Sequence, residues 1–594
     1  MKGSWLYAIS LLCSLCINYV HAQALIAPWG MSWSSQKFGP DGPWNAVSVR
    51  IGGNKSEIAL YPGAAWTSEI LLSTICENTT VSSYCYGDQA GLFDPAQSST
   101  YDDSSIMLAP NGGWSNILYG YTNAVPIYAE AKRALDSIDI GGSVVPSADL
   151  ITISQGYQIY PEGNEYPLQV GVLSLGSPEI NQTFTTSGVP INGTFVTSHL
   201  YETGTIPSYS YGMHIGSAAL NIPGSLYLGG YDRSRVIGEV SSQPVDGGAC
   251  PIQLVDIDIG VAAGASPWNS SSMTGLLMQG NASMASGVKV NMDPTNPYIY
   301  LPHSSCDAVA AKLPVTYNSA LGLYFWNTDS PLYTRIITSP SYLAFTFLKN
   351  GANTAHITIK VPFALLNLTL DAPLVSQPTP YFPCMGTDSD LALGRAFLQA
   401  AFMGVHWSKG RWFLAQAPGP DGSFIKDVAN IDTGSTTIAG SGNSWEGTWE
   451  NSWTPLASTN STNTTVANSN GLSIGAKAGI GVGCAVAGLL IFAVAFWLFR
   501  RRRGHHEQLS HSDICGKETA QPSYEQMAPV EIADTKPDSF PELGHGRDRG
   551  YAQDSILSSQ SGQTFTNSVG GQGIQQFPKH SNSDQQNVFE LATR

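Results

Sequence analysis

The hydrophobic pattern between Trp44 and Pro418 is that of short strands rather than long helices. Apolar and polar positions alternate with a period of two in stretches such as Val47-Ser-Val-Arg-Ile51, and Gly-Gly, Asn-Gly and Pro-rich turns separate them. Only Ser304–Leu313 and Gly394–Met403 have the pattern of short helices. This pattern predicts a mainly β protein.

The β region is long enough for two lobes. Its 375 residues, from 44 to 418, exceed the size expected of a single sandwich. We therefore predict an N-terminal lobe at 44–240 and a C-terminal lobe at 241–418.

The first 22 residues have the pattern of a secretory signal. Lys2 is followed by the apolar run Trp5–Ile17, and Val20-His21-Ala22 offers a small-residue cleavage site before Gln23. The apolar run is too short to cross a bilayer. We predict a signal peptide at 1–22 and a short N-terminal segment at 23–43.

A second apolar run, at 478–499, has 22 residues and no charge, and Arg500–Arg503 follow it directly. That length spans a bilayer, and the basic cluster places the C-terminus in the cytosol. We predict a single-pass type I protein of the plasma membrane with its N-terminus outside the cell. The small residues Gly475, Gly479 and Gly483 would allow a weak homodimer through the span.

Two polar segments flank the predicted span. Residues 419–473 are rich in Ser, Thr, Asn and Gly, which predicts a flexible stalk. Within it Trp445, Trp449 and Trp453 recur every four residues. They could form one helical face that contacts the lobes or the membrane surface, or they could belong to a loosely ordered segment. The tail, 500–594, is poor in apolar residues and is expected to be disordered.

The net charge of the chain argues against a nucleic-acid partner. The net charge is -16 and the pI about 5.0, whereas nucleic-acid binding needs a basic face. Charged residues are only 12 % of the chain, as is common in extracellular β proteins. We expect no nucleic-acid partner.

The cysteines and glycosylation sequons agree with an oxidising, extracellular compartment. Of nine cysteines, five lie between the signal and the span, so two disulfides and one unpaired thiol are expected. Nine Asn-x-Ser/Thr sequons all precede the span. They begin at Asn54, Asn78, Asn181, Asn192, Asn269, Asn281, Asn367, Asn460 and Asn463.

Five short motifs, in this order and spacing, make the β region resemble the pepsin-like (A1) aspartic peptidase family. They are Leu92-Phe-Asp-Pro-Ala-Gln-Ser-Ser-Thr-Tyr101, Val170-Gly-Val-Leu-Ser-Leu-Gly176, Gly224-Ser-Leu-Tyr-Leu-Gly-Gly-Tyr-Asp232, Asp293-Pro-Thr295 with Pro302, and Leu391-Ala-Leu-Gly394-Arg-Ala-Phe-Leu398. The opening Asp41-Gly-Pro-Trp44 resembles a degenerate, membrane-anchored group of that family in filamentous fungi.

The resemblance implies a bilobal fold, two disulfides and a particular chemistry. Cys76 with Cys85 and Cys306 with Cys384 match family bridges, whereas Cys250 has no family partner. In the family, one Asp-Thr-Gly turn from each lobe supplies a carboxylate, and the two share one proton and one water. The mechanism needs both carboxylates.

This sequence departs from that pattern at the first turn. Asp293 falls on the second aspartate, but Tyr61 falls on the first, and Pro62 replaces the threonine. A phenol with a pKa near 10 cannot replace a carboxylate. Tyr119 or Tyr121 corresponds to the family's flap tyrosine, with the register left open.

A literal Asp432-Thr-Gly-Ser-Thr436 motif follows the segment that resembles the end of the family domain. Ala-Asn-Ile precedes it rather than an apolar strand, so we interpret it as a turn in the stalk, with a catalytic replacement as the alternative. Asp293 is interpreted as a structural residue of its turn, with a binding role in the cleft as the alternative.

These observations predict a cell-surface glycoprotein whose peptidase-like ectodomain is non-catalytic and binds a peptide or cell-wall ligand in the inter-lobe cleft. The first alternative is an active membrane-anchored aspartic endopeptidase, for which Asp293 is the favourable residue and Tyr61 the obstacle. The second is a wall or stress sensor that acts through stalk and tail. No cofactor and no metal are expected.

Overall fold

The computed structural model describes residues 26–77, 84–104, 117–119, 124–186, 189–351, 354–422 and 424–457, all within one compact unit. The predicted signal peptide, the span at 478–499 and the tail at 500–594 lie outside these residues. Among the helices of the described ranges, none combines the length and the apolar character that a membrane crossing requires.

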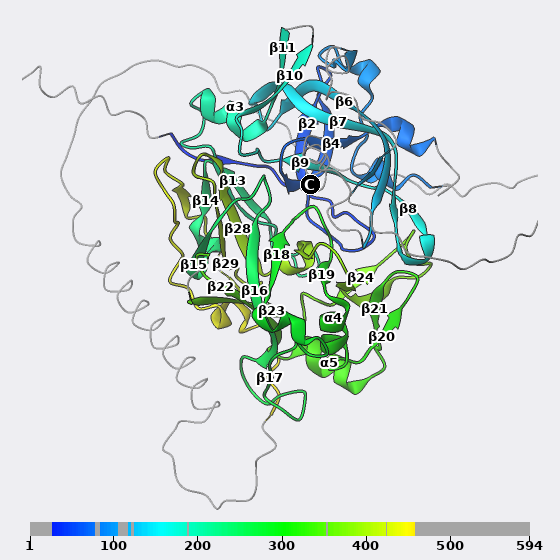
Figure 1. Ribbon diagram of the computed structural model, residues 1–594, viewed down its shortest axis with the longest axis vertical. Helices are drawn as coiled ribbons and strands as arrows, with labels where there is room; N and C mark the ends of the chain where they lie inside the picture. The colour runs from blue at the N-terminus through cyan, green and yellow to red at the C-terminus, as the bar shows by residue number, and fades with distance from the viewer. Residues whose placement is uncertain are drawn as a thin grey trace, which may run out of the picture. The chain divides into compact units, whose positions relative to one another are not determined.

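The N-terminal lobe is built on a ten-stranded sheet in the order β10-β11-β7-β4-β9-β3-β2-β6-β5, with β8 paired to β7 (Figure 1). The alternation predicted for 47–51 is confirmed, since Val47, Val49 and Ile51 of β2 are buried. The elements are β2 (Val47–Ile51), β3 (Ser56–Ala64), β4 (Ser68–Leu71), β5 (Ile117–Tyr119), β6 (Ile127–Asp139), β7 (Val144–Ile159), β8 (Glu165–Pro167), β9 (Gly171–Ser174), β10 (Asn181–Thr186), β11 (Val189–Thr194) and α3 (Val196–Glu202).

The C-terminal lobe contains an eight-stranded and a four-stranded sheet, drawn mostly in green in Figure 1. The first comprises β16 (Pro251–Val261), β17 (Ser272–Met273), β18 (Val288–Met292), β19 (Ile299–Leu301), β22 (Ser341–Leu348), β23 (His356–Pro362), β26 (Cys384–Gly386) and β27 (Ala392–Leu393). The second comprises β20 (Val315–Asn318), β21 (Leu323–Trp326), β24 (Leu368–Leu370) and β25 (Thr379–Phe382). The helices are α4 (His303–Ala310), α5 (Pro331–Thr338) and α6 (Arg395–Leu398).

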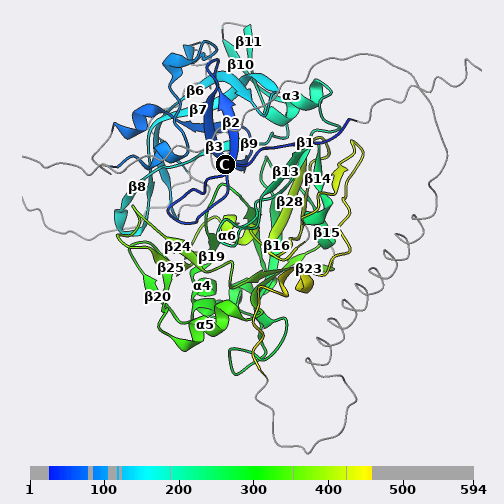
Figure 2. The same ribbon diagram turned by 180° about the vertical axis from the view of Figure 1, so that it is seen from behind.

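A six-stranded sheet takes strands from both halves of the chain, in the order β1-β13-β12-β28-β29-β15 (Figure 2). Its strands are β1 (Trp29–Gly30), β12 (Ser210–His214), β13 (Ser225–Leu228), β15 (Ile237–Pro244), β28 (Ala401–His406) and β29 (Arg411–Gln416). Because β12 pairs directly with β28, backbone hydrogen bonds join the two lobes. The predicted helix 394–403 ends early for this reason, since residues from Ala401 onward pair as a strand.

The predicted stalk begins too early, because residues 424–457 pack on the folded lobes. β30 (Val428–Asn430) pairs with β14 (Gly230–Asp232), and Leu456 forms a bridge with Ala265. The side chains of Trp445, Trp449 and Trp453 are 6 %, 1 % and 9 % exposed. The Ser- and Gly-rich composition favoured a flexible chain, but burial of three indoles stabilises an ordered one.

The tryptophans contact one another and the C-terminal lobe. The rings of Trp449 and Trp453 stack with centroids 5.2 Å apart, and Trp445 packs edge-on against Tyr342 at 5.7 Å. The Lys360 ammonium lies 4.8 Å from the Trp445 ring. These tryptophans therefore contact a lobe and do not belong to a loosely ordered segment.

The two lobes touch where the end of β3 meets the segment that follows β18. Gly63, at φ 120°, follows Tyr61 and lies against Pro294, which follows Asp293. A Cβ at position 63 would be 2.1 Å from Pro294 Cγ. Glycine is required at position 63 for two reasons: Pro294 approaches it closely, and its φ is positive.

This contact predicts a large difference between two glycine substitutions. Gly142 also has a positive φ, of 107°, but nothing lies within 4 Å of a Cβ built there. Gly142→Ala should cost about 1–3 kcal/mol from backbone strain alone. Gly63→Ala should cost about 1–3 kcal/mol more because Pro294 must move. Urea unfolding of both variants measures the difference, and equal losses would show that the turns are not in contact.

Two aspartates lie on one face of β16, and the pKa of one of them, Asp258, is raised. Asp256 and Asp258 are two positions apart, so their side chains project from the same side of the strand. Burial, together with the charge and a hydrogen bond of Asp256, raises the pKa of Asp258 from 3.8 to about 6. The folded state therefore holds a proton that the unfolded chain releases at lower pH.

We expect the contribution of Asp258 to stability to fall as pH rises from about 4 to 6, because the raised pKa favours the protonated, folded form only at low pH. Asp258→Asn removes this loss, so the variant should gain on the wild type over that interval, by about 1 kcal/mol after allowance for solvent screening. Urea unfolding at pH 3.5, 5 and 7 measures the effect, with the exposed Asp329→Asn as matched control. A pH-independent difference for Asp258→Asn would contradict the assignment.

Candidate functional site

A cleft between the lobes contains both positions that the sequence places at its centre. It encloses about 1410 Å³ of empty space, part of it open to solvent, and its lining includes Tyr61 and Asp293. The N-terminal segment also contributes Gly39, Pro40 and Asp41 to its wall. The cleft is therefore assembled from three separate parts of the chain.

Tyr61 is held in the middle of the N-terminal sheet. It lies on β3 opposite Val172 of the parallel strand β9, and its side chain is only 6 % exposed. Its hydroxyl is buried without a hydrogen-bond partner among the described residues. Burial raises the pKa of Tyr61 well above its ordinary value, opposed by the charge of Arg395 and reinforced by that of Asp41. The phenol therefore stays neutral and cannot act as a carboxylate.

Asp293 is held by the turn that it begins. Its Oδ1 accepts hydrogen bonds from the backbone N–H and the hydroxyl of Thr295, at 2.9 and 2.6 Å, and its Oδ2 accepts one from Asn296 Nδ2 at 2.8 Å. Burial raises the pKa of Asp293, and these hydrogen bonds and the charge of Arg395 oppose the shift. These three hydrogen bonds tie the carboxylate of Asp293 to its own turn.

Asp41 and Arg395 are two residues of the site that the sequence reasoning missed. Asp41 is 4 % exposed; its Oδ1 accepts a hydrogen bond from Trp44 Nε1 at 2.7 Å, and its Oδ2 lies 4.0 Å from Arg395 Nη2. Burial raises the pKa of Asp41, and the Arg395 guanidinium opposes that rise. The only sequence signals were the Asp41-Gly-Pro-Trp44 motif and a charged residue inside the apolar run that follows Leu391.

Arg395 connects the parts of this site. Its Nη1 donates to the carbonyl oxygens of Pro294 and Thr295, at 3.1 and 2.7 Å. Its guanidinium also lies over the ring of Tyr61, 4.0 Å from the centroid, and over that of Trp44 at 5.1 Å. One buried cation therefore contacts the tyrosine, the second-lobe turn and the carboxylate of Asp41.

This arrangement disfavours the acid–base chemistry of a carboxylate pair. Sharing one proton requires two carboxylates that repel each other strongly, so that only one ionises. Here a guanidinium lies beside Asp41 and contacts the turn of Asp293, and a positive charge favours the ionised form of both. A phenol occupies the place of the first-lobe carboxylate.

The Asp432-Thr-Gly motif is not among the residues that line the cleft. Asp432 is exposed and begins a turn in which Ser435 N–H donates to its carbonyl oxygen at 2.8 Å, which agrees with the interpretation as a turn. Tyr119 ends β5 and pairs with Ile127 of β6. The side chain of Tyr119 and all of Tyr121 lie outside the described residues, so the flap register stays open.

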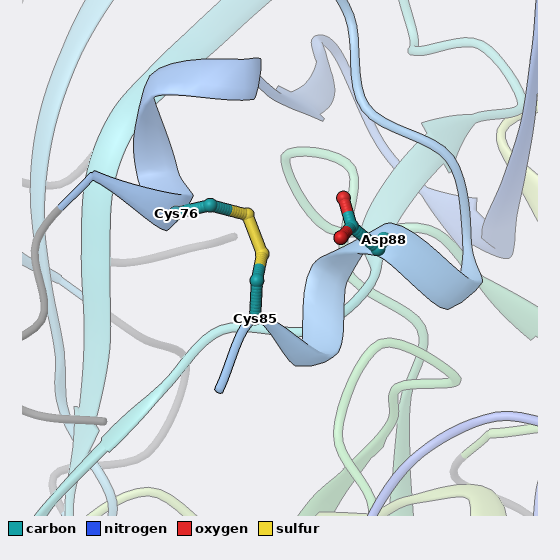
Figure 3. Close-up of side chains that lie close together, drawn as sticks. All are labelled: Cys76, Cys85 and Asp88. Atoms are coloured by element: carbon teal, nitrogen blue, oxygen red, sulfur yellow. A yellow bond between two sulfur atoms is a disulfide. The ribbon is translucent and has the colours of Figure 1, made fainter. Parts of the chain in front are cut away.

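The disulfides join the pairs that the resemblance implies. Cys76 and Cys85 are bonded beside Asp88, with Cα atoms 5.1 Å apart (Figure 3). Cys306 is bonded to Cys384, with Cα atoms 5.8 Å apart, and ties α4 to β26.

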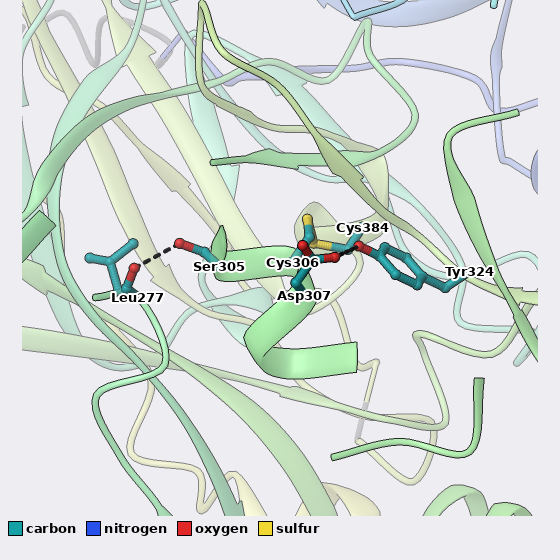
Figure 4. The surroundings of a disulfide bond; sticks show 6 residues. All are labelled: Leu277, Ser305, Cys306, Asp307, Tyr324 and Cys384. Atoms are coloured by element: carbon teal, nitrogen blue, oxygen red, sulfur yellow. Dashed lines mark hydrogen bonds between the residues drawn. A yellow bond between two sulfur atoms is a disulfide. The ribbon is translucent and has the colours of Figure 1, made fainter. Parts of the chain in front are cut away.

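Hydrogen bonds hold α4 on either side of its disulfide. Ser305 donates to the Leu277 carbonyl oxygen, and Asp307 accepts from the Tyr324 hydroxyl, each at 2.7 Å (Figure 4). Cys250 is buried with a free thiol and lines the cleft.

Cys76, Cys85 and Asp88 are also close enough together to suggest a metal site within the described ranges. Their geometry does not fit one, because the two sulfurs are bonded to each other (Figure 3). Thiolates, and not disulfide sulfurs, are the ligands of metal ions.

The sequons within the described ranges are reachable from solvent, and their glycosylation stays a prediction. Asn54, Asn192 and Asn269 are exposed, while Asn181, Asn281 and Asn367 are partly exposed. The remaining three, Asn78, Asn460 and Asn463, lie outside the described residues.

Comparison with known proteins agrees with the fold. The family model for eukaryotic aspartyl proteases matches residues 68–417, which is more than half of the chain. Rhizopuspepsin-2 of Rhizopus niveus is 23 % identical over 269 residues, 45 % of this chain and 56 % of that protein, so the match spans about half of the relative's length. The family match begins after Tyr61, so the departure at that position lies outside the matched region. The chain belongs to the eukaryotic aspartyl protease family.

Proposed function

We propose that the protein is a non-catalytic member of its family, a membrane-anchored cell-surface glycoprotein that binds an extended ligand in the inter-lobe cleft. The observation that carries this proposal is the pairing of Tyr61 with Arg395. A neutral phenol stands in place of the first carboxylate, and a guanidinium lies 4.0 Å over its ring. The cleft is retained while half of the acid–base pair is absent.

A second candidate, an active aspartic endopeptidase, is favoured by one observation. Asp41 lines the same cleft as Asp293 and is a buried carboxylate whose pKa is raised. In this candidate Asp41 would replace the missing first-lobe aspartate. Against it stands the contact of Arg395 with Asp41, because this positive charge opposes the rise that burial causes in the pKa of that carboxyl.

Peptide hydrolysis separates the two candidates. We expect purified full-length protein to show no cleavage of a broad peptide library between pH 3 and 6 that a statine-based inhibitor suppresses. Circular dichroism verifies that the protein used is folded, and the exposed Asp329→Asn is the matched control. Inhibitor-sensitive turnover that is lost in Asp293→Asn would overturn the non-catalytic assignment. Its further loss in Asp41→Asn would identify the second carboxylate.

Membrane anchoring is supported by the uncharged run at 478–499 and the arginines that follow it. The full-length protein should remain with membranes after carbonate extraction, whereas a variant lacking 478–499 should appear in the medium. Recovery of the full-length protein in the soluble fraction would contradict the proposal.

A wall or stress sensor that signals through the tail remains an alternative to simple ligand binding. A variant that ends after Arg503 keeps the ectodomain and the basic cluster but lacks most of the tail. Loss of a cellular response in this variant, with ligand binding intact, would favour the sensor.

A further inference from the structure

A loop of the N-terminal segment reaches the position that Tyr61 occupies. Residues 34–46, called here the N-terminal loop, begin and end at one point, because the Ser34 N–H donates to the Ala46 carbonyl oxygen at 2.8 Å. Within the loop, Phe38 and Trp44 pair through two backbone hydrogen bonds of 3.0 and 2.8 Å. Residues 39–43 therefore form the tip of a narrow hairpin.

The tip of the N-terminal loop lies against the Tyr61 hydroxyl. A Cβ built on Gly39 would be only 2.7 Å from the hydroxyl oxygen. Gly39 and Pro40 are partly exposed and line the cleft, whereas the hydroxyl itself is buried. A ligand that enters the cleft at this place would therefore meet the loop before it met the hydroxyl.

Backbone hydrogen bonds fasten the tip to the C-terminal lobe. The Asp371 N–H donates to the Pro40 carbonyl oxygen at 2.8 Å. The Thr369 N–H, in β24, donates to the Gly42 carbonyl oxygen at 3.2 Å. Both acceptors belong to the tip and both donors to the other lobe. The N-terminal loop therefore spans the cleft from the start of β2 to β24.

Asp41 adds a buried polar latch at the same tip. Its carbonyl oxygen accepts a hydrogen bond from the Tyr381 hydroxyl, and its Oδ2 lies 4.0 Å from Arg395 Nη2. A buried ion pair adds little net stability because both charges lose their hydration, but removal of one partner is strongly destabilising. Asp41 is therefore the residue whose substitution should release the tip.

Opening of the N-terminal loop would leave the two lobes joined. The pairing of β12 with β28 and the hydrogen bond between the hydroxyls of Tyr160 and Tyr298 do not use the loop. Segments held by few contacts open at a lower free energy than the core that carries them. Burial of Phe38 and Trp44 still makes the closed loop the resting state.

We propose that the N-terminal loop is a lid over the centre of the cleft, latched by the contact of Asp41 with Arg395. In the closed state it blocks access to Tyr61 and Arg395, so a ligand that reaches them has to displace it. This inference rests on the proposed binding function in taking the cleft as the ligand site, and it specifies how access to that site is controlled.

Amide hydrogen exchange of the full-length protein tests whether the loop opens separately. Asp41→Asn removes the charge and keeps the shape of the side chain, so it should speed exchange at the Thr369 and Asp371 amides about tenfold or more. The amides of β22 report global unfolding and should exchange as in the wild type. The matched control, Asp427→Asn, breaks an exposed ion pair with Arg233 and should change neither set.

Two results of this experiment would overturn the inference. Unchanged exchange at Thr369 and Asp371 would show that Asp41 does not hold the loop closed. An equal acceleration in β22 would show that the loop is part of the folding core and not a lid. If Asp41→Asn does not fold, Tyr381→Phe decides the question, because it removes one hydroxyl of the latch and should speed exchange about 2- to 10-fold.

Thiol labelling tests whether the loop covers position 61. Tyr61→Cys places a thiol next to Gly39, and N-ethylmaleimide should label it slowly while the loop is closed. Adding Asp41→Asn should speed labelling about tenfold or more, measured by mass spectrometry on the peptide that contains position 61. Adding Asp427→Asn instead should leave the rate within about twofold. Equal rates with and without Asp41→Asn would contradict the lid.

Failure of the lid and failure of the proposed function are separate results. Neither exchange nor labelling uses a ligand, so a negative outcome in both would leave the binding function standing. Inhibitor-sensitive peptide hydrolysis would overturn the non-catalytic function and leave the lid in place.

Discussion

The buried guanidinium of Arg395 is the constraint on which the centre of the molecule depends. A cation that is almost fully removed from water has to be compensated, and the compensation here comes from three places. Asp41 supplies the opposite charge, the turn after Asp293 supplies two carbonyl oxygens, and the Tyr61 ring supplies a π-face. The N-terminal segment, the first lobe and the second lobe are joined through this one side chain.

Contacts other than those of Arg395 also explain how the two lobes stay together. The six-stranded sheet and the approach of Gly63 to Pro294 keep the lobes together without any help from a catalytic pair. Other links cross the cleft, including a hydrogen bond of 2.6 Å between the hydroxyls of Tyr160 and Tyr298. The lobes are therefore held together by contacts that directly involve neither Tyr61 nor Asp293.

Some of the site was predictable because it is encoded locally. Asp293 is satisfied by Thr295 and Asn296, two and three residues along the chain, so a turn with an aspartate at its start is visible in the sequence. The ordered segment 424–457 was not predictable in this way. Its composition indicates flexibility, whereas its stability comes from buried indoles, one of which, Trp445, packs on Tyr342, a residue distant in the sequence.

The sequence by itself determined the β architecture and the turn at Asp293 and, with the family resemblance, the two disulfide pairs. These features follow from periodicity, from short motifs and from their order along the chain. Only the tertiary structure decided that Arg395 contacts both the carboxylate of Asp41 and the ring of Tyr61. The physical reason is that the energy of a buried charge or hydroxyl depends mainly on how deeply it is buried and on which group it contacts. Both are set by segments that lie far apart in the chain, and not by the neighbouring residues in the sequence.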